Sequence, residues 1–434
     1  MTASTSRDSR FRVSASQAQS LVGQFGTPLY VVDESHFRNR IRSYLGAFRT
    51  VYPRSELSFA SKANSTLALM AIAAQEGCCI DVASEGELRA ALAAGVAASS
   101  CFFHGNNKSH TELEFALRQG IGHIVADHFG EIETLAALMP FQAETKIILR
   151  LAPGVDPVTH AKISTGQADT KFGFNIADGS AERATIRCVE LGLPLLGFHC
   201  HVGSQLLDPE AQRSGGSTIA QFAIAMKEKH GFWAEYLNVG GGLGVRYTAS
   251  EEPMPVEDYC RLVVQAVQSA LEGSGLSPVL GQEPGRSLIS ESGVSLYTVG
   301  VVKTVPAKDR VSRTYVAVDG GLSDNPRPAL YGAKYEVEPI AKTASPNMTV
   351  TVSGKHCETD TLFPDIQLPS DIGPGDILQV LCTGAYNSSM SSNYNRYPRP
   401  ATVLIRESGN FDLIQRRDSW DEMLAREILP EGIR

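Results

Sequence analysis

The chain of 434 residues carries 39 basic and 47 acidic side chains, which gives a formal net charge of -8 with histidine neutral. This balance excludes a general nucleic-acid binder, which needs a basic face, and a hydrophobic content of 43% excludes an intrinsically disordered chain. No apolar run approaches the roughly 18–20 residues that cross a bilayer, and the opening MTASTSRDSR lacks an apolar signal core. We therefore expect a cytoplasmic globular protein of at least two domains with no membrane partner.

Short apolar runs alternate with helical patterns from about residue 57 to residue 288. Residues 67–74 place apolar side chains at helical spacing, and later helical patterns stop at Gly95 and Gly120, as helix ends commonly do. Eight strands, each followed by a helix or a long crossover, are the number in a (β/α)8 barrel. A doubly wound open sheet is the alternative, but the composition does not change between two halves. The predicted strands are Leu57–Ser61, Cys79–Ala83, Cys101–His104, His123–Ala126, Lys146–Leu151, Leu195–His201, Glu235–Val239 and Pro278–Gln282.

The pattern changes after about residue 290, where strands of alternating polarity are separated by turns such as Asn325-Pro326. Pro28–Val32 near the start of the chain is strand-like too. We expect residues 1–34 to join a β domain, residues 35–289 to form the barrel and residues 290–434 to form a C-terminal β-rich domain. The predicted strands of this last region are Val294–Thr304, Thr314–Val318, Met348–Val352, Ile377–Leu381, Ala401–Arg406 and Phe411–Arg416.

The eight cysteines show neither a disulfide framework nor the paired spacing of a zinc site, so no structural metal is expected. Most of them, including Cys78, Cys188, Cys260 and Cys382, are interpreted as small buried apolar side chains. Cys357 is the exception, for the reason given below.

Reactive side chains gather where the predicted barrel strands end, which is where barrel enzymes build their active sites. Lys62 directly follows an apolar strand, where partial desolvation would favour a neutral amine able to attack an aldehyde. A strand-end lysine that reaches into solvent is the alternative. The residues at the strand ends are Lys62, Asp81, Ser84, His104, His201, Ser204, Gly240–Gly242, Glu283 and Arg286.

Three motifs supply complementary chemistry. The glycines of NVGGGLG let backbone N–H groups approach an oxyanion, although such turns are common without a ligand. In FHCHVGSQ, His199 and His201 share one face of a strand; one could stack on a flat ring, His199 is favoured as a core histidine, and no third metal ligand is placed nearby. In QEPGRSL, Glu283 could face a pyridine nitrogen or pair with Arg286 at the surface. An amine, a glycine turn, an imidazole and a carboxylate together indicate pyridoxal phosphate.

Ten ordered motifs between about Thr27 and Leu429 extend this pattern over nearly the whole chain. They are FASKANS, DVASEGE, GNNKS, STGxxxTKFGFN, HCHVGSQ, NVGGGLG, EPGRSL, RPALYGA, GKHCET and GAYNSSMSSNYNRYPRP. In these motifs the chain resembles the diaminopimelate decarboxylase family, a barrel-type pyridoxal phosphate group related to ornithine and arginine decarboxylases and to alanine racemase. The resemblance implies an alanine-racemase-like barrel of fold type III, a β-rich domain and a homodimer with shared active sites.

The resemblance also implies roles for individual residues. Lys62 would hold pyridoxal phosphate as a Schiff base, His201 would stack on its ring, and Glu283 would bind its nitrogen. Cys357 matches the proton donor, which in this family reaches the active site of the partner subunit. Further cofactor contacts are implied for Asp81, Ser204, Gly240, Gly241, Gly242, Pro284, Gly285, Arg286 and Tyr386. Substrate contacts are implied for Arg286, Arg327, Tyr331, Glu358 and Tyr386.

The substrate prediction depends on the planar guanidinium of Arg327, which suits a second carboxylate. It favours decarboxylation of meso-2,6-diaminopimelate to L-lysine, a step of lysine biosynthesis. Two departures from the family pattern leave an alternative open: the acid after Cys357 comes one position early, and Tyr335 stands where the family usually has histidine. A decarboxylase of the same mechanism that acts on a modified amino acid of siderophore or antibiotic biosynthesis fits these departures.

Two other functions are weighed against decarboxylation. An amino-acid racemase would share the barrel and the cofactor, but it would need a tyrosine acid–base group in place of Cys357. A non-catalytic relative would be expected to lose Lys62 or Cys357, and the chain keeps both.

Overall fold

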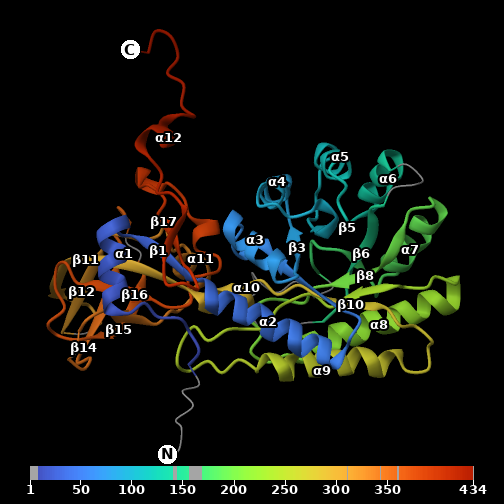
Figure 1. Cartoon of the computed structure of the whole chain (residues 1–434), viewed down its shortest axis with the longest axis horizontal. Helices are drawn as coiled ribbons and strands as arrows, with labels where there is room; N and C mark the ends of the chain where they lie inside the picture. The colour runs from blue at the N-terminus through green and yellow to red at the C-terminus, as the bar shows by residue number, and fades with distance from the viewer. Residues whose placement is uncertain are drawn as a thin grey trace, which may run out of the picture. The chain divides into compact units, whose positions relative to one another are not determined.

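A computed structural model describes residues 8–139, 144–155, 169–309, 311–342, 344–358 and 361–433. The chain divides into two compact units, each described by itself (Figure 1). The barrel unit comprises Arg38–Val245 and Glu251–Leu288, and the β unit comprises Met1–Phe37, Arg246–Ser250 and Ile289–Arg434. The expected division at residues 34 and 289 lacks the short segment Arg246–Ser250, which interrupts the barrel sequence.

Eight parallel strands close into a ring in the described part of the barrel unit. Each strand pairs with two neighbours, and the pairing of β5 with β6 closes the circle. This closure confirms the predicted (β/α)8 barrel, because a doubly wound sheet would leave two open edges. The short β7 (Phe174–Asn175) pairs additionally with β6. The barrel strands are β2 (Ser55–Ala60), β3 (Cys79–Val82), β4 (Cys101–Phe103), β5 (His123–Ala126), β6 (Lys146–Ala152), β8 (Leu195–Cys200), β9 (Tyr236–Asn238) and β10 (Val279–Gln282).

Helices surround these strands, as Figure 1 shows for α3 to α9. Two of them begin at serines whose hydroxyl groups accept from a backbone N–H three residues later: Ser84 caps α4 and Ser109 caps α5. No helix of the described residues is both long enough and apolar enough to cross a membrane. The helices are α2 (Glu34–Val51), α3 (Leu67–Gln75), α4 (Glu85–Ala93), α5 (His110–Arg118), α6 (Phe129–Leu138), α7 (Ser180–Glu190), α8 (Glu210–His230), α9 (Val256–Leu271) and α10 (Arg286–Ile289).

Aromatic side chains fill the interior of the barrel. The Phe102 ring stacks on the His123 imidazole with centroids 4.0 Å apart, and it also lies 5.9 Å from the Tyr236 ring. Strands β4 and β9 are not neighbours in the ring, so these side chains meet across the barrel. The closed end of the barrel is therefore packed, as in other barrels of this size.

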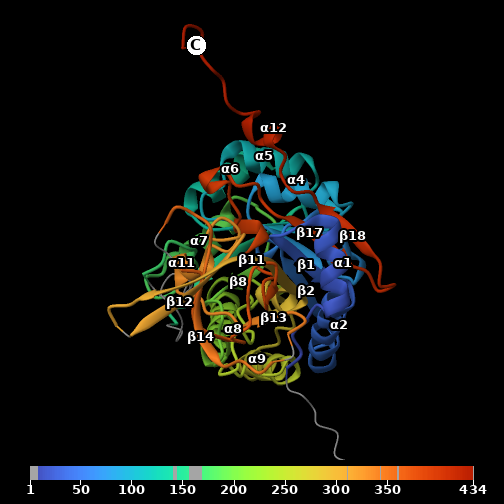
Figure 2. The same ribbon diagram turned by 90° about the vertical axis from the view of Figure 1, so that its left-hand side faces the viewer.

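The β unit contains a nine-stranded sheet among its described residues. Strand β1 pairs antiparallel with β11 and parallel with β17, so the N-terminal strand lies inside this sheet. Figure 2 shows the long hairpin of β11 and β12. Its strands are β1 (Leu29–Asp33), β11 (Gly293–Pro306), β12 (Ser312–Val318), β13 (Val337–Pro339), β14 (Met348–Ser353), β15 (Phe363–Leu368), β16 (Ile377–Val380), β17 (Ala401–Ile405) and β18 (Phe411–Gln415), and its helices are α1 (Ala15–Phe25), α11 (Arg327–Tyr331) and α12 (Trp420–Leu424).

Two of these strands, β13 and β15, were not predicted. Strand β13 spans three residues, too few to produce a periodic pattern. In β15, Asp365 has a φ of 55°, and the pairing with β14 is irregular, so buried and exposed positions do not alternate. Of the cysteines interpreted as buried, Cys78, Cys188, Cys260 and Cys382 are all buried.

The stacked His123 makes the stability of the barrel depend on pH. Burial lowers the pKa of His123 from 6.5 to about 4. At pH 5 the unfolded chain binds a proton there and the folded chain does not, so stability falls as the pH drops below 6.5. This one group should cost about 2 kcal/mol at pH 5. We expect His123→Phe to lose less stability between pH 7 and pH 5 than the wild type, measured by urea unfolding.

The exposed His110 provides the matched control, since His110→Phe removes an imidazole without touching the barrel interior. If His123→Phe and the wild type lose the same stability between the two pH values, the assignment of a neutral buried His123 is wrong.

Candidate active site

Lys62 lies at the open end of the barrel, in the short turn Ser61–Ala63 that directly follows β2. Ser61, beside it, is buried and its hydroxyl donates to the backbone carbonyl of Asp81 at 2.7 Å, which ties the ends of β2 and β3 together. Lys62 is exposed in the described chain, whereas its neighbours Ser61 and Ala63 are buried. Its amine is thus accessible from the barrel mouth. The desolvation of its amine stays a prediction.

A buried carboxylate, Glu283, lies at the end of β10 between two histidines. His199 Nε2 is 2.6 Å from Glu283 Oε1, and His104 Nε2 is 3.3 Å from Glu283 Oε2. The two imidazole rings meet edge to face with centroids 5.0 Å apart. Because the three side chains come from β10, β8 and the end of β4, the cluster spans the barrel interior.

The protonation states of this cluster follow from its burial. Desolvation lowers the pKa of His104 well below its usual value, so the ring is neutral. Burial opposes ionisation of Glu283, but the facing His199 and His104 outweigh it and hold the pKa of that carboxyl well below its ordinary value. Burial and the nearby Glu283 raise the pKa of Asp81 well above its ordinary value. One carboxylate is therefore ionised while its neighbour favours the protonated form.

The glycine turn after β9 packs against two neighbouring strand ends. A Cβ atom on Gly240 would lie 2.5 Å from the carbonyl oxygen of Cys200, and one on Gly241 would lie 2.4 Å from the carbonyl oxygen of Glu283. Gly240 and Gly242 also adopt positive φ angles, of 72° and 126°. Only glycine fits these three positions, so the turn presents bare backbone to the barrel mouth.

His201 faces this turn. The backbone N–H of Gly241 donates to His201 Nδ1 over 3.3 Å, which leaves Nε2 to carry the proton of a neutral ring. Burial and the charge of Lys62 lower the pKa of His201 well below its usual value, in agreement with that state. His199 lies in β8, and His201 follows directly after the end of that strand.

The EPGRSL segment joins these parts. The carbonyl oxygen of Pro284 accepts from the backbone N–H of Ala60 at 3.2 Å, and a Cβ atom on Gly285 would lie 3.0 Å from the Ala60 carbonyl oxygen. Arg286 donates from Nε and Nη2 to the Ser204 hydroxyl at 3.1 and 3.0 Å. The segment therefore fixes Glu283 against the end of β2, just before the turn that carries Lys62.

The predicted substrate residues all belong to the β unit, apart from Arg286. Arg327 is buried and Tyr331 is half-buried, both in α11. Tyr386 is half-buried, with a φ of 60° that is rare for a bulky side chain. Thr359 and Asp360, which carry part of the shifted acidic motif, lie outside the described residues, as do residues 164–168 of the STGxxxTKFGFN motif.

Cys357, the predicted proton donor, is exposed. Its backbone N–H donates to Asn395 Oδ1 at 3.0 Å, which fixes the turn that carries the thiol. The neighbouring Glu358 accepts a hydrogen bond from the Tyr394 hydroxyl.

The cluster also holds residues that sequence reasoning did not assign. His199 is fully buried, as expected for a core histidine, and its Nε2 also makes the short contact with Glu283. No third ligand was placed near the histidine pair, yet one donor atom each from His104, His199 and Glu283 lie within 4.8 Å of one another. Arg150 is buried in β6, with its guanidinium 4.2 Å from the Phe172 ring centroid, and burial lowers its pKa. The sequence signal for Arg150 is its position as a charged residue within the otherwise apolar strand KIILRLA.

These residues fit a phosphorylated pyridine aldehyde. Asp81 Oδ1 and Glu283 Oε2 are buried without a hydrogen-bond partner among the described residues, which leaves acceptors for a donor group. The bare glycine backbone suits a phosphate, and the exposed Lys62 suits an aldehyde. Such a barrel belongs to the class of barrel-type pyridoxal-dependent enzymes.

Comparisons with known proteins identify the family of this chain within that class. The pyridoxal-binding domain of the pyridoxal-dependent decarboxylases matches residues 38–290. Diaminopimelate decarboxylase of Bacillus subtilis is 42% identical over 413 residues, which cover 94% of this chain and 93% of the relative. A crystal structure of diaminopimelate decarboxylase from M. jannaschii with L-lysine has a TM-score of 0.89 and 31% identity, covering 98% of this chain and 97% of the other. The Helicobacter pylori enzyme with L-lysine gives a TM-score of 0.84 and 30% identity, covering 94% and 98%. The chain belongs to the diaminopimelate decarboxylase family.

The close packing of the glycine turn can be tested directly. In Gly241→Ala the new methyl group must displace the Glu283 carbonyl, so both the turn and the cluster shift. We expect the affinity for pyridoxal phosphate to fall by at least about tenfold, since one or more hydrogen bonds to a charged group are lost. Titration of the apoenzyme with the cofactor, followed by absorbance, measures the change.

Gly46→Ala is the control, because a Cβ atom there meets nothing within 4 Å. Unchanged cofactor affinity in Gly241→Ala would show that the turn does not contact the phosphate.

Proposed function

We propose that this chain decarboxylates meso-2,6-diaminopimelate to L-lysine and CO2 with pyridoxal phosphate. The observation that carries the proposal is the buried Glu283, which lies between His199 and His104 at the end of the barrel where Lys62 is exposed. When bound, pyridoxal phosphate supplies an aldehyde that joins amines and a protonated ring that withdraws electrons from the bond to the departing carboxylate. Family membership over nearly the full length supports the same reaction.

The barrel residues would hold the cofactor. Lys62 Nζ would bind its aldehyde, and His201 would stack on its ring as a neutral imidazole. Glu283 would keep a proton on the pyridine nitrogen, because an ionised carboxylate accepts from that N–H. The phosphate side would be held by Ser204, Gly240, Gly241 and Gly242, and Asp81, Pro284, Gly285 and Arg286 would complete the contacts. Tyr386 of the β unit is assigned to the cofactor by the family resemblance alone.

The reaction also needs a proton at the carbon that loses the carboxylate. Cys357 is the candidate donor, because its thiol is exposed on a turn fixed by Asn395. By resemblance to the family, we propose that this donor serves the active site of the partner subunit, in a homodimer with shared active sites.

Substrate choice would depend on Arg327. Its guanidinium is buried, and no carboxylate of the described residues forms an ion pair with it. A buried cation that no described carboxylate pairs with suits a bound anion such as the distal carboxylate of diaminopimelate. The remaining polar groups of the substrate would contact Tyr331, Glu358 and Arg286.

A second candidate is a decarboxylase of the same mechanism with a larger carboxylate-bearing substrate. The observation in its favour is Tyr335, which replaces the usual histidine of the family and contacts Arg327. Both candidates need the same cofactor chemistry, so only the substrate distinguishes them.

A substrate panel tests the proposal. The purified holoenzyme should release CO2 and L-lysine from meso-diaminopimelate, and Lys62→Ala should not, because it lacks the amine that binds the aldehyde. Borohydride treatment followed by mass spectrometry should place a pyridoxyl group on Lys62 in the wild type. A pyridoxyl group on another residue contradicts the assignment of Lys62. Turnover of a larger conjugate without turnover of diaminopimelate selects the second candidate.

Removal of the thiol tests the proton donor. Cys357→Ala should retain the cofactor absorbance and lower kcat by about 10²–10⁴-fold, the usual contribution of a positioned acid. Cys188→Ala is the control, because it also removes one thiol but at a buried position in the barrel unit that has no predicted role in the reaction. An unchanged kcat in Cys357→Ala would assign the proton to another group.

A further inference from the structure

Arg327 is surrounded by aromatic rings in the β unit. Its guanidinium carbon lies 4.9 Å from the ring centroid of Tyr247 and 5.6 Å from that of Tyr335. Arg327 Nη1 also donates to the Tyr335 hydroxyl at 2.5 Å. The two tyrosine rings meet edge to face with centroids 5.2 Å apart. Tyr247 and Tyr335 together thus form one aromatic surface beside the guanidinium, which we call the seat.

We propose that Tyr335 and Tyr247 are positioning residues that orient Arg327 to receive the distal carboxylate of the substrate. The inference rests on the proposed function and deepens it. Neutral tyrosines stabilise the buried cation through a hydrogen bond and through the ring faces. A protein carboxylate in the same place would pair with Arg327 and compete with the substrate. The seat therefore fixes the direction of the guanidinium and leaves its charge available.

The two tyrosines come from segments that are far apart in the sequence. Tyr247 belongs to Arg246–Ser250, the short part of the β unit that interrupts the barrel sequence. Tyr335 lies between α11 and β13, and its ring also meets the Phe363 ring at 5.8 Å. Further contacts must therefore hold these two segments in place.

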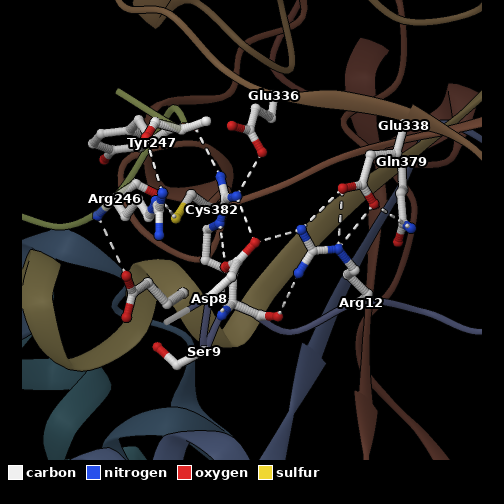
Figure 3. A network of polar contacts seen from close by, with 12 residues as sticks. Asp8, Ser9, Arg12, Arg246, Tyr247, Glu336, Glu338, Gln379 and Cys382 are labelled. Atoms are coloured by element: carbon white, nitrogen blue, oxygen red, sulfur yellow. Dashed lines mark hydrogen bonds and ion pairs between the residues drawn. The ribbon is translucent and has the colours of Figure 1, made fainter. Parts of the chain in front are cut away.

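A polar network that includes Asp8, Tyr247 and Glu336 does this (Figure 3). Arg10 Nη1 donates to the backbone carbonyl of Tyr247 at 3.2 Å, and Nη2 pairs with Glu336, the neighbour of Tyr335, at 2.5 Å. Asp8 accepts from Arg10 Nε and Nη2 at 2.8 and 2.7 Å, so the guanidinium is bound on both sides. The Arg10 side chain is 2% exposed, which makes these contacts strong. The buried guanidinium of Arg10 thus binds both the segment that carries Tyr247 and the segment that carries Tyr335. We call these contacts the Arg10 clamp.

Neighbouring contacts keep the clamp in place. Arg12 makes a bidentate contact with Glu338 at 2.9 to 3.0 Å and a further ion pair with Asp8 at 2.6 Å. On the other side, the Cys382 thiol donates to the backbone carbonyl of Arg246 at 3.2 Å. The segments that carry Tyr247 and Tyr335 are each bound at two points.

The test compares two ligands that differ by one carboxylate. L-Lysine carries the carboxylate that Arg327 would receive, and cadaverine is the same diamine without it. We expect the wild-type holoenzyme to bind L-lysine more tightly than cadaverine, measured as competitive inhibition constants. Tyr335→Phe removes only the hydroxyl that accepts from Arg327. It should weaken L-lysine binding about tenfold and leave cadaverine binding unchanged. For meso-diaminopimelate, KM should rise by a similar factor with kcat within about threefold.

Tyr52→Phe is the matched control, because the Tyr52 hydroxyl donates to the backbone carbonyl of Pro278 in the barrel unit and touches neither tyrosine of the seat. A second pair of variants tests the rings independently. Tyr247→Phe keeps the ring beside Arg327 and should retain more of the preference for L-lysine than Tyr247→Leu, which should lose it.

The outcomes separate this inference from the proposed function. A wild type that releases CO2 from diaminopimelate and prefers L-lysine, with the same preference in Tyr335→Phe and Tyr247→Leu, overturns the seat alone. A wild type that neither releases CO2 nor prefers L-lysine overturns the proposed function, and the seat with it. Equal losses of L-lysine and cadaverine binding would assign the tyrosines a merely structural role and also overturn the inference.

Discussion

The site depends on one buried charge. Glu283 can stay ionised inside the barrel because His199 contacts one of its oxygens and His104 lies near the other. Without those contacts the cost of removing a carboxylate from water would protonate it. Much of the local architecture serves this position: β8 and β4 bring the two rings, and the EPGRSL segment ties the carboxylate to the end of β2. The neighbouring Asp81 is protonated more readily as a consequence.

Sequence reasoning predicted the barrel well because its strands are short buried runs with clear boundaries. His123–Ala126 was predicted with its observed bounds, and Cys79–Ala83 differs by one residue. The strand-end rule then placed Lys62, Asp81, His201 and Glu283 at one end of the barrel, where the structure has them. Periodicity could not show contacts between strands that are distant in the sequence. For this reason the sequence predicts His199 as a buried core residue, which it is, but does not show its contact with Glu283.

Other misses have similar physical causes. Strands β13 and β15 are too short or too irregular for an alternating pattern. The seat of Arg327 combines Tyr247 and Tyr335, whose association depends on the clamp by Arg10 at the other end of the chain. Tyr335 was noticed only as a departure from the family pattern, and the structure gives it a partner.

The segment Arg246–Ser250 has a consequence for the evolution and engineering of this chain. The polypeptide leaves the barrel after β9, contributes five residues to the β unit and returns to build α9 and β10. Neither unit is a contiguous stretch of the gene, so a cut at residue 289 yields a fragment that still carries a piece of the other unit. A chimera that exchanges β units between relatives must therefore exchange this pentapeptide as well, together with the N-terminal segment that binds it.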